Sequence, residues 1–213
     1  MSPAGCGSLS AVPRITAHVS MSLDGFIAGP DQSLEQPLGV GGRELHHWHD
    51  GTSDDPVDAA AAERVMAPRG AYVMGRNMFG PVRGEWGESG WRGWWGDEPP
   101  YHAPVFVLTH HPRESIEMDG GTTFHFVSDF DEAIARAVEA AGEDTVTIAG
   151  GASAVRQGLE RGLVEEILVN HVPVTLGGGE SIFAGLAGLR LEVLDVQRSP
   201  YATHTTYRVL TRE

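Results

Sequence analysis

The chain has 213 residues, with 15 Lys and Arg against 29 Asp and Glu, and a formal net charge of −14 at pH 7. A surface this acidic repels nucleic acid and anionic membranes, so we expect neither as a partner. The length and the 41% content of hydrophobic residues are typical of one soluble domain with a sizeable core.

The N-terminal residues 1–11 are rich in small side chains, and we expect a flexible leader there, followed by a single domain over residues 12–213. The one cysteine, Cys6, lies in this leader, so no intramolecular disulfide can form, which fits a reducing cytoplasm. The leader lacks the basic and apolar regions of a signal peptide, and no apolar run is long enough to span a membrane. We therefore expect a cytoplasmic protein.

Strands and helices are predicted to alternate along the chain. The first strand covers residues 14–20, and a loop rich in glycine and proline follows it. A short helix is predicted over residues 43–50 and a longer one over 58–66, where an alanine run favours helix, Asp58 stands near the start and Pro68 follows the end. The remaining elements are predicted as strands over 71–74, 104–109, 123–127, 145–148 and 164–172, helices over 129–141 and 152–159, and a hairpin over 189–199 and 203–212.

This order indicates an α/β fold with a mostly parallel sheet and antiparallel strands at its C-terminal end. A tryptophan-rich segment, residues 85–96, interrupts the order and holds four of the five Trp. The segment could be a lid or an interface, or it could merely cover the core.

The strand over residues 145–148 leads through Gly150 and Gly151 into the helix over 152–159. The first N–H groups of a helix lack internal partners and its dipole is positive there, so this turn could bind the pyrophosphate of a dinucleotide. A plain connection that needs glycine for packing is the alternative.

Two further strand ends carry glycine or basic residues, Gly75-Arg76 and the segment from Thr109 to Arg113. Ligands of α/β sheets bind outside the carboxyl ends of the strands, so the three strand ends can surround one dinucleotide. Arg76 could grip a phosphate with its guanidinium fork, and Thr109 could add a hydroxyl donor.

The chain resembles the dihydrofolate reductase superfamily, and more closely the reductase domain of the bifunctional riboflavin-biosynthesis deaminase-reductases and their stand-alone relatives. The segments that carry the resemblance are residues 19–28, Val73-Met74-Gly75-Arg76, Val107-Leu108-Thr109, Ile148-Ala149-Gly150-Gly151, and residues 168–183 with Pro173 and Leu176-Gly177-Gly178-Gly179-Glu180. The resemblance covers roughly residues 14–212. It implies a dihydrofolate-reductase-like three-layer α/β/α fold with a C-terminal antiparallel hairpin.

The resemblance also implies NADPH as the cofactor. Its adenosine 2′-phosphate is expected near Arg76 and the Thr109–His110 turn, its pyrophosphate at residues 151–153, and its nicotinamide against Ser20, Ile27 and Ala28. The cofactor-binding residues expected on this basis are Ser20, Ile27, Ala28, Gly75, Arg76, Asn77, Leu108, Thr109, His110, Gly150, Gly151, Ala152, Ser153 and Val155.

Two carboxylates are candidates for a catalytic role. Asp58 stands near the place of the carboxylate that true dihydrofolate reductases carry in their first helix, although a residue favoured by the helix dipole explains it too. Asp24 matches a position in the family's active-site loop, where a turn beside Gly25 is the alternative. The riboflavin-pathway reductases read a ribosyl-phosphate substrate with basic groups, and this chain has few candidates for that role.

A cluster of His46, His47, His49 and Asp50 raises the question of a metal. No second group of ligands with metal spacing accompanies it, so we predict no metal and expect these side chains on the substrate side or on a solvated helix.

These observations predict an NADPH-dependent oxidoreductase that transfers a hydride to a small heteroaromatic or carbonyl or imine substrate, possibly of pyrimidine or pterin type. The alternatives are a non-catalytic binding protein that keeps the nucleotide pocket, and a hydrolase or metal enzyme built on the histidine cluster. A homodimer is implied by the resemblance to the reductase domains.

Overall fold

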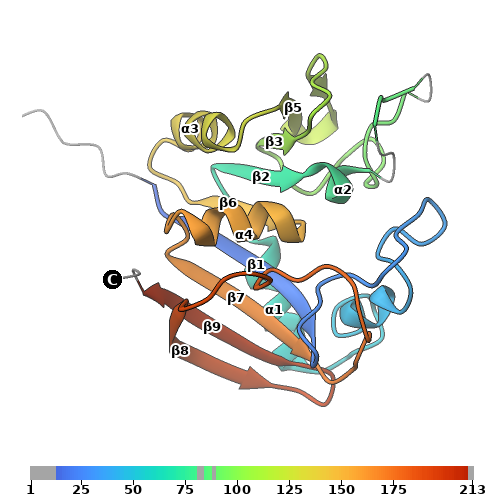
Figure 1. Cartoon of the computed structure of the whole chain (residues 1–213), viewed down its shortest axis with the longest axis vertical. Helices are drawn as coiled ribbons and strands as arrows, with labels where there is room; N and C mark the ends of the chain where they lie inside the picture. The colour runs from blue at the N-terminus through green and yellow to red at the C-terminus, as the bar shows by residue number, and fades with distance from the viewer. Residues whose placement is uncertain (1–12, 81–83, 88–89, 211–213) are drawn as a thin grey trace, which may run out of the picture.

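The structure is a computed structural model, and it describes residues 13–80, 84–87 and 90–210. Within these residues, nine strands form one sheet in the order β4-β5-β3-β2-β6-β1-β7-β9-β8 (Figure 1). The strands are β1 (Ile15–Ser22), β2 (Ala71–Gly75), β3 (Pro104–Leu108), β4 (Ile116–Glu117), β5 (Thr123–Val127), β6 (Val146–Gly150), β7 (Glu166–Val172), β8 (Arg190–Arg198) and β9 (Thr203–Leu210).

Most of the sheet is parallel. Strands β5, β3, β2, β6, β1 and β7 run in the same direction, and β4, β9 and β8 add antiparallel pairs at the two ends. The α/β fold with a mostly parallel sheet and a C-terminal antiparallel hairpin, β8–β9, is therefore confirmed. None of the helices in the described residues has the length and apolar character needed to cross a membrane.

Helices cover both faces of the sheet. The helical elements are α1 (Pro56–Met66), α2 (Arg76–Phe79), α3 (Phe130–Ala141), α4 (Ala152–Glu160) and the 3₁₀ turns η1 (Gly42–His46) and η2 (Asp119–Gly121). Helices α3 and α4 contact β2, β3, β5 and β6, whereas α1 contacts β8. In Figure 1, α4 lies in front of the sheet and α1 behind it.

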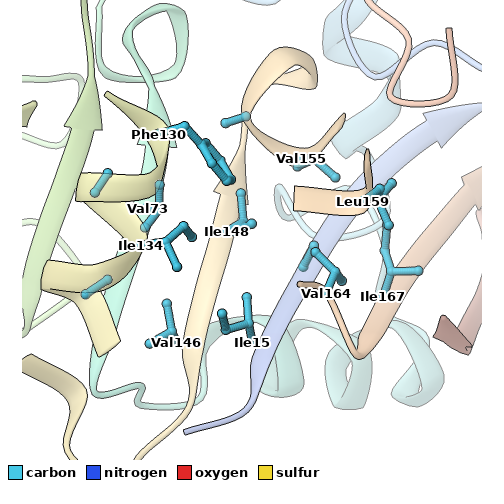
Figure 2. Close-up of a cluster of buried hydrophobic side chains, with 14 of the residues drawn as sticks. Ile15, Val73, Phe130, Ile134, Val146, Ile148, Val155, Leu159, Val164 and Ile167 are labelled. Carbon is cyan, nitrogen blue, oxygen red and sulfur yellow. The ribbon is translucent and has the colours of Figure 1, made fainter. Parts of the chain in front are cut away.

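The larger core lies between the sheet and the pair α3 and α4. Figure 2 shows Phe130 and Ile134 of α3 and Val155 of α4 pointing toward Ile148 of β6. On β1, the residues at odd positions face this core, because side chains alternate between the two faces of a strand. His18 and Ser20 at even positions consequently face the other side of the sheet.

Two separate clusters of side chains cover the second face of the sheet, one over each half. Near β7 and β9, a small core joins Leu45 and Trp48 to Ala61 of α1. Near β2, β3 and β5, the short helix α2 contributes Met78 and Phe79 to the cover. The tryptophan-rich segment packs beside it, with Trp86 and Trp95 on an aromatic cluster around Phe124. The space between the two halves lies over the centre of the sheet.

The element boundaries differ from the expected ones in a few places. The short helix expected over residues 43–50 is a 3₁₀ turn that ends at His46. Helix α1 starts earlier than expected, because the Asp55 side chain accepts a hydrogen bond from Val57 N at 2.8 Å and Pro56 begins the helix without needing an N–H acceptor. Strand β4, two residues long at the edge, was not predicted.

Candidate functional site

A cavity of about 1040 Å³ lies at the carboxyl ends of the central parallel strands and extends over the second face of the sheet. One end of the cavity is bordered by the start of α4 and by the turns after β2 and β3. The other end lies under Trp48 and above His18 and Asn170. Its size and its place at the strand ends are typical of a ligand site in an α/β fold.

The glycine turn before α4 leaves the backbone open to a ligand. Gly150 has φ +138°, and a Cβ there would lie 3.0 Å from Met78 Sδ, so the turn itself requires glycine. Gly151 is the N-cap of α4, and a Cβ added to it would meet no atom within 4 Å. Because Gly151 and Ser153 line the cavity, the first N–H groups of α4 can bind an anion there.

Arg76 and Thr109 are joined at the neighbouring ends of β2 and β3. Arg76 Nη1 donates to Thr109 Oγ1 at 3.0 Å, while Arg76 Nε and Nη2 are buried and make no hydrogen bond within the described residues. Burial lowers the pKa of Arg76 from its usual value. A guanidinium with two unused donors at a cavity wall fits an anionic ligand group.

Trp86 lies between two guanidinium groups. Its ring centroid is 3.4 Å from Cζ of Arg76 and 3.9 Å from Cζ of Arg113. Trp86 Nε1 donates to the carbonyl of His111 at 2.6 Å, which fixes the ring against the turn after β3. This tryptophan therefore covers the arginine at the cavity wall, a contact that the sequence did not predict.

The loop that follows β1 is held over the cavity by residues 176–180, the glycine-rich segment between β7 and β8. Ile27 N–H donates to Glu180 O at 2.8 Å, and Glu180 N–H donates to Ala28 O at 2.9 Å. In the described part of the chain, this pairing leaves the Ile27 carbonyl and the Ala28 N–H without a hydrogen bond. These two groups form one acceptor and one donor beside the cavity that both residues line.

Three histidines line the far end of the cavity. Burial, reinforced by the nearby positive charge of Arg69, lowers the pKa of His18 to about 4. Burial also lowers the pKa of His46 to about 4, and it lowers that of His49. Their rings are neutral at pH 7, and His46 Nδ1 and His49 Nε2 share a hydrogen bond of 3.0 Å. Among the described residues, no group of three or more His, Cys, Asp or Glu is arranged to hold a metal ion.

The cavity brings together most of the residues expected to bind the cofactor. Those that line it are Ser20, Ile27, Ala28, Arg76, Asn77, Leu108, Thr109, His110, Gly150, Gly151, Ala152 and Ser153. Two of the expected residues lie elsewhere. Val155 is fully buried in the core under α4, so its side chain faces away from the cavity. Gly75 lies behind the turn, where an added Cβ would be 3.7 Å from Gly151 N.

Neither of the two candidate catalytic carboxylates lines the cavity. Asp24 is exposed and accepts hydrogen bonds from Ser22 Oγ at 2.6 Å and from Gly177 N at 2.7 Å. The Ser22 hydroxyl, together with backbone N–H groups at residues 176 and 177, lowers the pKa of Asp24. Asp24 thus ties the first loop to the glycine-rich loop, and we assign it no contact with substrate.

Asp58 is almost fully buried below the cavity. Its two carboxylate oxygens bind His204 Nε2 at 2.8 Å and Ser53 Oγ at 2.5 Å. Because α1 starts at Pro56, Asp58 lies in the first turn of the helix and faces the sheet, not the ligand space. A direct catalytic role for Asp58 is therefore not retained.

Several cavity residues were missed by reasoning from the sequence, among them His18, Trp48 and Asn170. Trp94 and Trp95 also line the cavity, and they belong to the tryptophan-rich segment for which a lid or an interface was one of the expectations. His18 and Asn170 are polar residues inside predicted core strands, and a polar residue in a buried strand is a signal that could have identified them. Trp48 gave no such signal, because only the packing of η1 against the sheet places it over β1.

The comparisons with known proteins agree with this geometry. The family model described as the RibD C-terminal domain matches residues 13–205. No curated protein sequence matches the chain.

Among solved structures, a putative riboflavin biosynthesis protein from Shewanella sp. PV-4 matches with a TM-score of 0.61 and 22% identity, covering 93% of this chain and 99% of that one. A pyrimidine reductase-like protein from Corynebacterium diphtheriae matches with a TM-score of 0.54 and 17% identity, over 94% and 93% of the two chains.

A longer protein from Thermotoga maritima shares the fold over part of its length. It is a diaminohydroxyphosphoribosylaminopyrimidine deaminase/5-amino-6-(5-phosphoribosylamino)uracil reductase, and it matches with a TM-score of 0.60 and 15% identity. The alignment covers 93% of this chain and 57% of that protein. At these identities the likeness establishes the fold, and the match of the family model over residues 13–205 shows that the chain belongs to the RibD C-terminal domain family.

Proposed function

We propose that this protein is an NADPH-dependent reductase of a small heterocyclic substrate of pyrimidine type. The observation that carries the proposal is a continuous cavity that joins the helix N-terminus and Arg76 at one end to a lobe of neutral, hydrogen-bonding side chains at the other. A dinucleotide needs an anion site and an extended groove, and a heterocycle needs a flat pocket with a few polar groups.

The residues at the first end fit the phosphates of NADPH. Gly151 and Ser153 would bind the pyrophosphate through backbone N–H groups, and Gly151 leaves room for it because nothing lies within 4 Å of its added Cβ. Arg76 and Thr109 would hold the 2′-phosphate, since two guanidinium nitrogens of Arg76 have no hydrogen-bond partner among the described residues. In a chain with a net charge of −14, such a local cation is needed to bind an anion.

The middle of the cavity fits the nicotinamide. The Ala28 N–H and the Ile27 carbonyl are the donor and acceptor that a carboxamide requires. When bound, NADPH supplies a hydride to an electrophilic carbon of the substrate. The chain holds the two reactants in contact and excludes water, which is the contribution of positioning to such a transfer.

The far lobe fits a neutral heterocycle. His18 and His46 have pKa values of about 4, so both rings are uncharged at pH 7 and can donate or accept a hydrogen bond without a net charge. Trp94 and Trp95 add aromatic faces for stacking. The Thermotoga maritima relative is named for the reduction of 5-amino-6-(5-phosphoribosylamino)uracil, and that aminopyrimidine is the first substrate to test.

The test is a titration of the protein with NADPH, followed by a substrate panel that contains this aminopyrimidine and dihydrofolate. Loss of NADPH absorbance with the aminopyrimidine supports the proposal, and loss with dihydrofolate alone would move the substrate to the pterin class. Tight NADPH binding with no turnover of any panel member would favour the non-catalytic binding protein. Absence of NADPH binding would overturn the proposal.

A homodimer remains a proposal that rests on the family resemblance. Strand β8 is an edge strand with three apolar side chains that are more than one third exposed, Val193, Leu194 and Val196. Exposed apolar groups on a sheet edge suit an interface. Sedimentation velocity of the purified chain, and of Val196→Lys beside it, tests this, and a wild-type monomer at micromolar concentration contradicts it.

A further inference from the structure

A buried row of polar side chains crosses three strands below the cavity. Ser20 of β1 is paired with Asn170 of β7, and Asn170 is paired with His204 of β9. Residues paired across neighbouring strands share one face of the sheet, so all three face the side that carries the cavity. Ser20 and Asn170 line the cavity, whereas His204 has no exposed surface.

The row is anchored at its far end by Asp58. His204 Nε2 lies 2.8 Å from Asp58 Oδ1, and His204 Nδ1 lies 2.7 Å from Asn170 Oδ1. Each ring nitrogen of His204 faces an oxygen, one of Asp58 and one of Asn170. Asp58 Oδ2 accepts from Ser53 Oγ at 2.5 Å, so both of its carboxylate oxygens are engaged.

This chain of contacts fixes the orientation of the Asn170 carboxamide. Its oxygen accepts from His204, so the group left for a ligand is the amide nitrogen. No hydrogen bond of the described residues uses Asn170 Nδ2, and this nitrogen is not among their fully buried unpaired atoms, so it opens onto the cavity that Asn170 lines. A donor that opens onto the cavity can bind an acceptor of a ligand there.

Trp48 closes the row from above. Its Nε1 donates to Ser20 Oγ at 3.0 Å, and its ring meets that of His204 edge to face at 4.9 Å between centroids. Trp48 is 2% exposed and packs on His204, so it helps to keep solvent away from that ring. The amide nitrogen is thereby directed at the cavity from a rigid position on a central strand.

We propose that Asn170 donates a hydrogen bond from its side-chain nitrogen to an acceptor on the heterocycle, and that Asp58 and His204 are positioning residues that hold the carboxamide in this orientation. The inference rests on the proposed function and extends it to one contact with the substrate. The ligand group is a carbonyl oxygen, which both a pyrimidinedione and a pterin present, or an unprotonated ring nitrogen, which a pterin presents. Asn170 takes no part in binding the cofactor phosphates, which lie at the other end of the cavity.

The first test is Asn170→Asp, which keeps the oxygen toward His204 and replaces the donor by an acceptor. With 5-amino-6-(5-phosphoribosylamino)uracil as the probe, we expect its dissociation constant to rise about 5- to 150-fold, the cost of leaving a buried polar group unpaired. The dissociation constant of NADPH should stay within about twofold. His171→Gln is the matched control, because His171 is the next residue of β7, faces the other side of the sheet and bonds Tyr207.

A second variant covers the case in which Asn170→Asp does not fold. Asn170→Thr retains a hydroxyl donor on a smaller side chain, so it should bind the probe more tightly than Asn170→Ala. Equal probe binding by the folded Thr and Ala variants, or wild-type binding by Asn170→Asp, would overturn the role of Asn170. NADPH oxidation by the wild-type protein is measured in parallel, so a wrong substrate contact is distinguished from a wrong function.

The positioning role is tested by a double-mutant cycle. Asp58→Asn retains the size of the side chain but weakens its hydrogen bond to His204. In the wild-type background we therefore expect weaker probe binding, and in the Asn170→Asp background we expect little further loss. A purely structural effect of Asp58 would instead weaken probe binding by the same factor in both backgrounds. That additive result would remove Asp58 and His204 from the proposal and leave Asn170 alone.

Discussion

Arg76 donates from Nη1 to Thr109 Oγ1 at 3.0 Å across the ends of two neighbouring parallel strands, β2 and β3. The contact joins residues 33 positions apart in the chain. Within residues 13–80, 84–87 and 90–210, Arg76 Nε and Nη2 have no hydrogen-bond partner at the cavity wall, and Trp86 lies over the guanidinium group. The contact is therefore the basis for a prediction on cofactor choice.

Arg76→Ala should weaken NADPH binding about 10- to 150-fold, because hydrogen bonds to a charged group are worth roughly 1.5–3 kcal/mol. NADH lacks the 2′-phosphate, so its dissociation constant should change little. Both constants are measured by titration at low and moderate salt, since screening reduces the difference. Arg136→Ala removes the same charge from the surface of α3 and should leave both constants unchanged. An equal loss for the two cofactors would show that Arg76 does not read the 2′-phosphate.

Gly151→Val should weaken NADPH binding by more than about tenfold, which corresponds to about 1.4 kcal/mol. The variant should fold, because Gly151 has a negative φ and no atom lies within 4 Å of its added Cβ, but the side chain would fill the space at the start of α4. Gly178→Val is the control, since its added Cβ also meets nothing and Gly178 does not line the cavity. Wild-type affinity in a folded Gly151→Val protein would show that the pyrophosphate binds elsewhere.

The intrinsic fluorescence of the protein should change when the cavity is filled. Trp94 and Trp95 line the cavity, whereas Trp91 donates from Nε1 to the carbonyl of Phe79 and packs outside it. Addition of NADPH or the aminopyrimidine should therefore shift or quench the emission of the wild-type protein, and Trp95→Phe should reduce the response more than Trp91→Phe. If the two variants respond alike, the tryptophan-rich segment only covers the aromatic core.

Lowering the pH from 7 to 5 should reduce the free energy of unfolding, and His18 should account for part of this loss. Burial lowers the pKa of His18 to about 4, below the value of 6.5 in the unfolded chain. Between pH 4 and pH 6.5 the unfolded state binds more protons at this residue than the folded state does. The free energy of unfolding therefore decreases as the pH falls from 6.5 toward 4. Since the ring faces a cavity that water can enter, we expect His18 to lower the free energy of unfolding by about 1–2 kcal/mol between pH 7 and pH 5.

Urea unfolding of the wild-type protein and of His18→Gln at both pH values measures this contribution. The variant should lose less stability than the wild type over the same interval, because glutamine does not titrate. Acidic side chains that titrate near pH 5 contribute equally to the two proteins and cancel in the comparison. An identical pH dependence would place the His18 pKa close to its unfolded value.

The strand-and-helix order could be predicted from the sequence because each element carries a local signal. The apolar run Val105–Leu108 is typical of a buried strand, the alanine-rich residues 130–141 form a helix, and Gly150-Gly151 marks the turn between β6 and α4. The end of the cavity at the start of α4, which we propose binds phosphate, was predictable for the same reason. A glycine turn at a strand end is a short-range pattern, and its chemistry follows from the helix that it begins.

The end of the cavity beside Asn170 was decided only by the tertiary structure. Asn170, His204 and Asp58 come from β7, β9 and α1, and their contacts span up to 146 positions of the chain. Asp58 looked like a catalytic carboxylate from its place near the start of a helix, but the face that α1 turns toward the sheet buries it against His204. Local residue preferences determine which elements form, whereas strand register and helix packing determine which polar side chains meet and which of them reach the cavity.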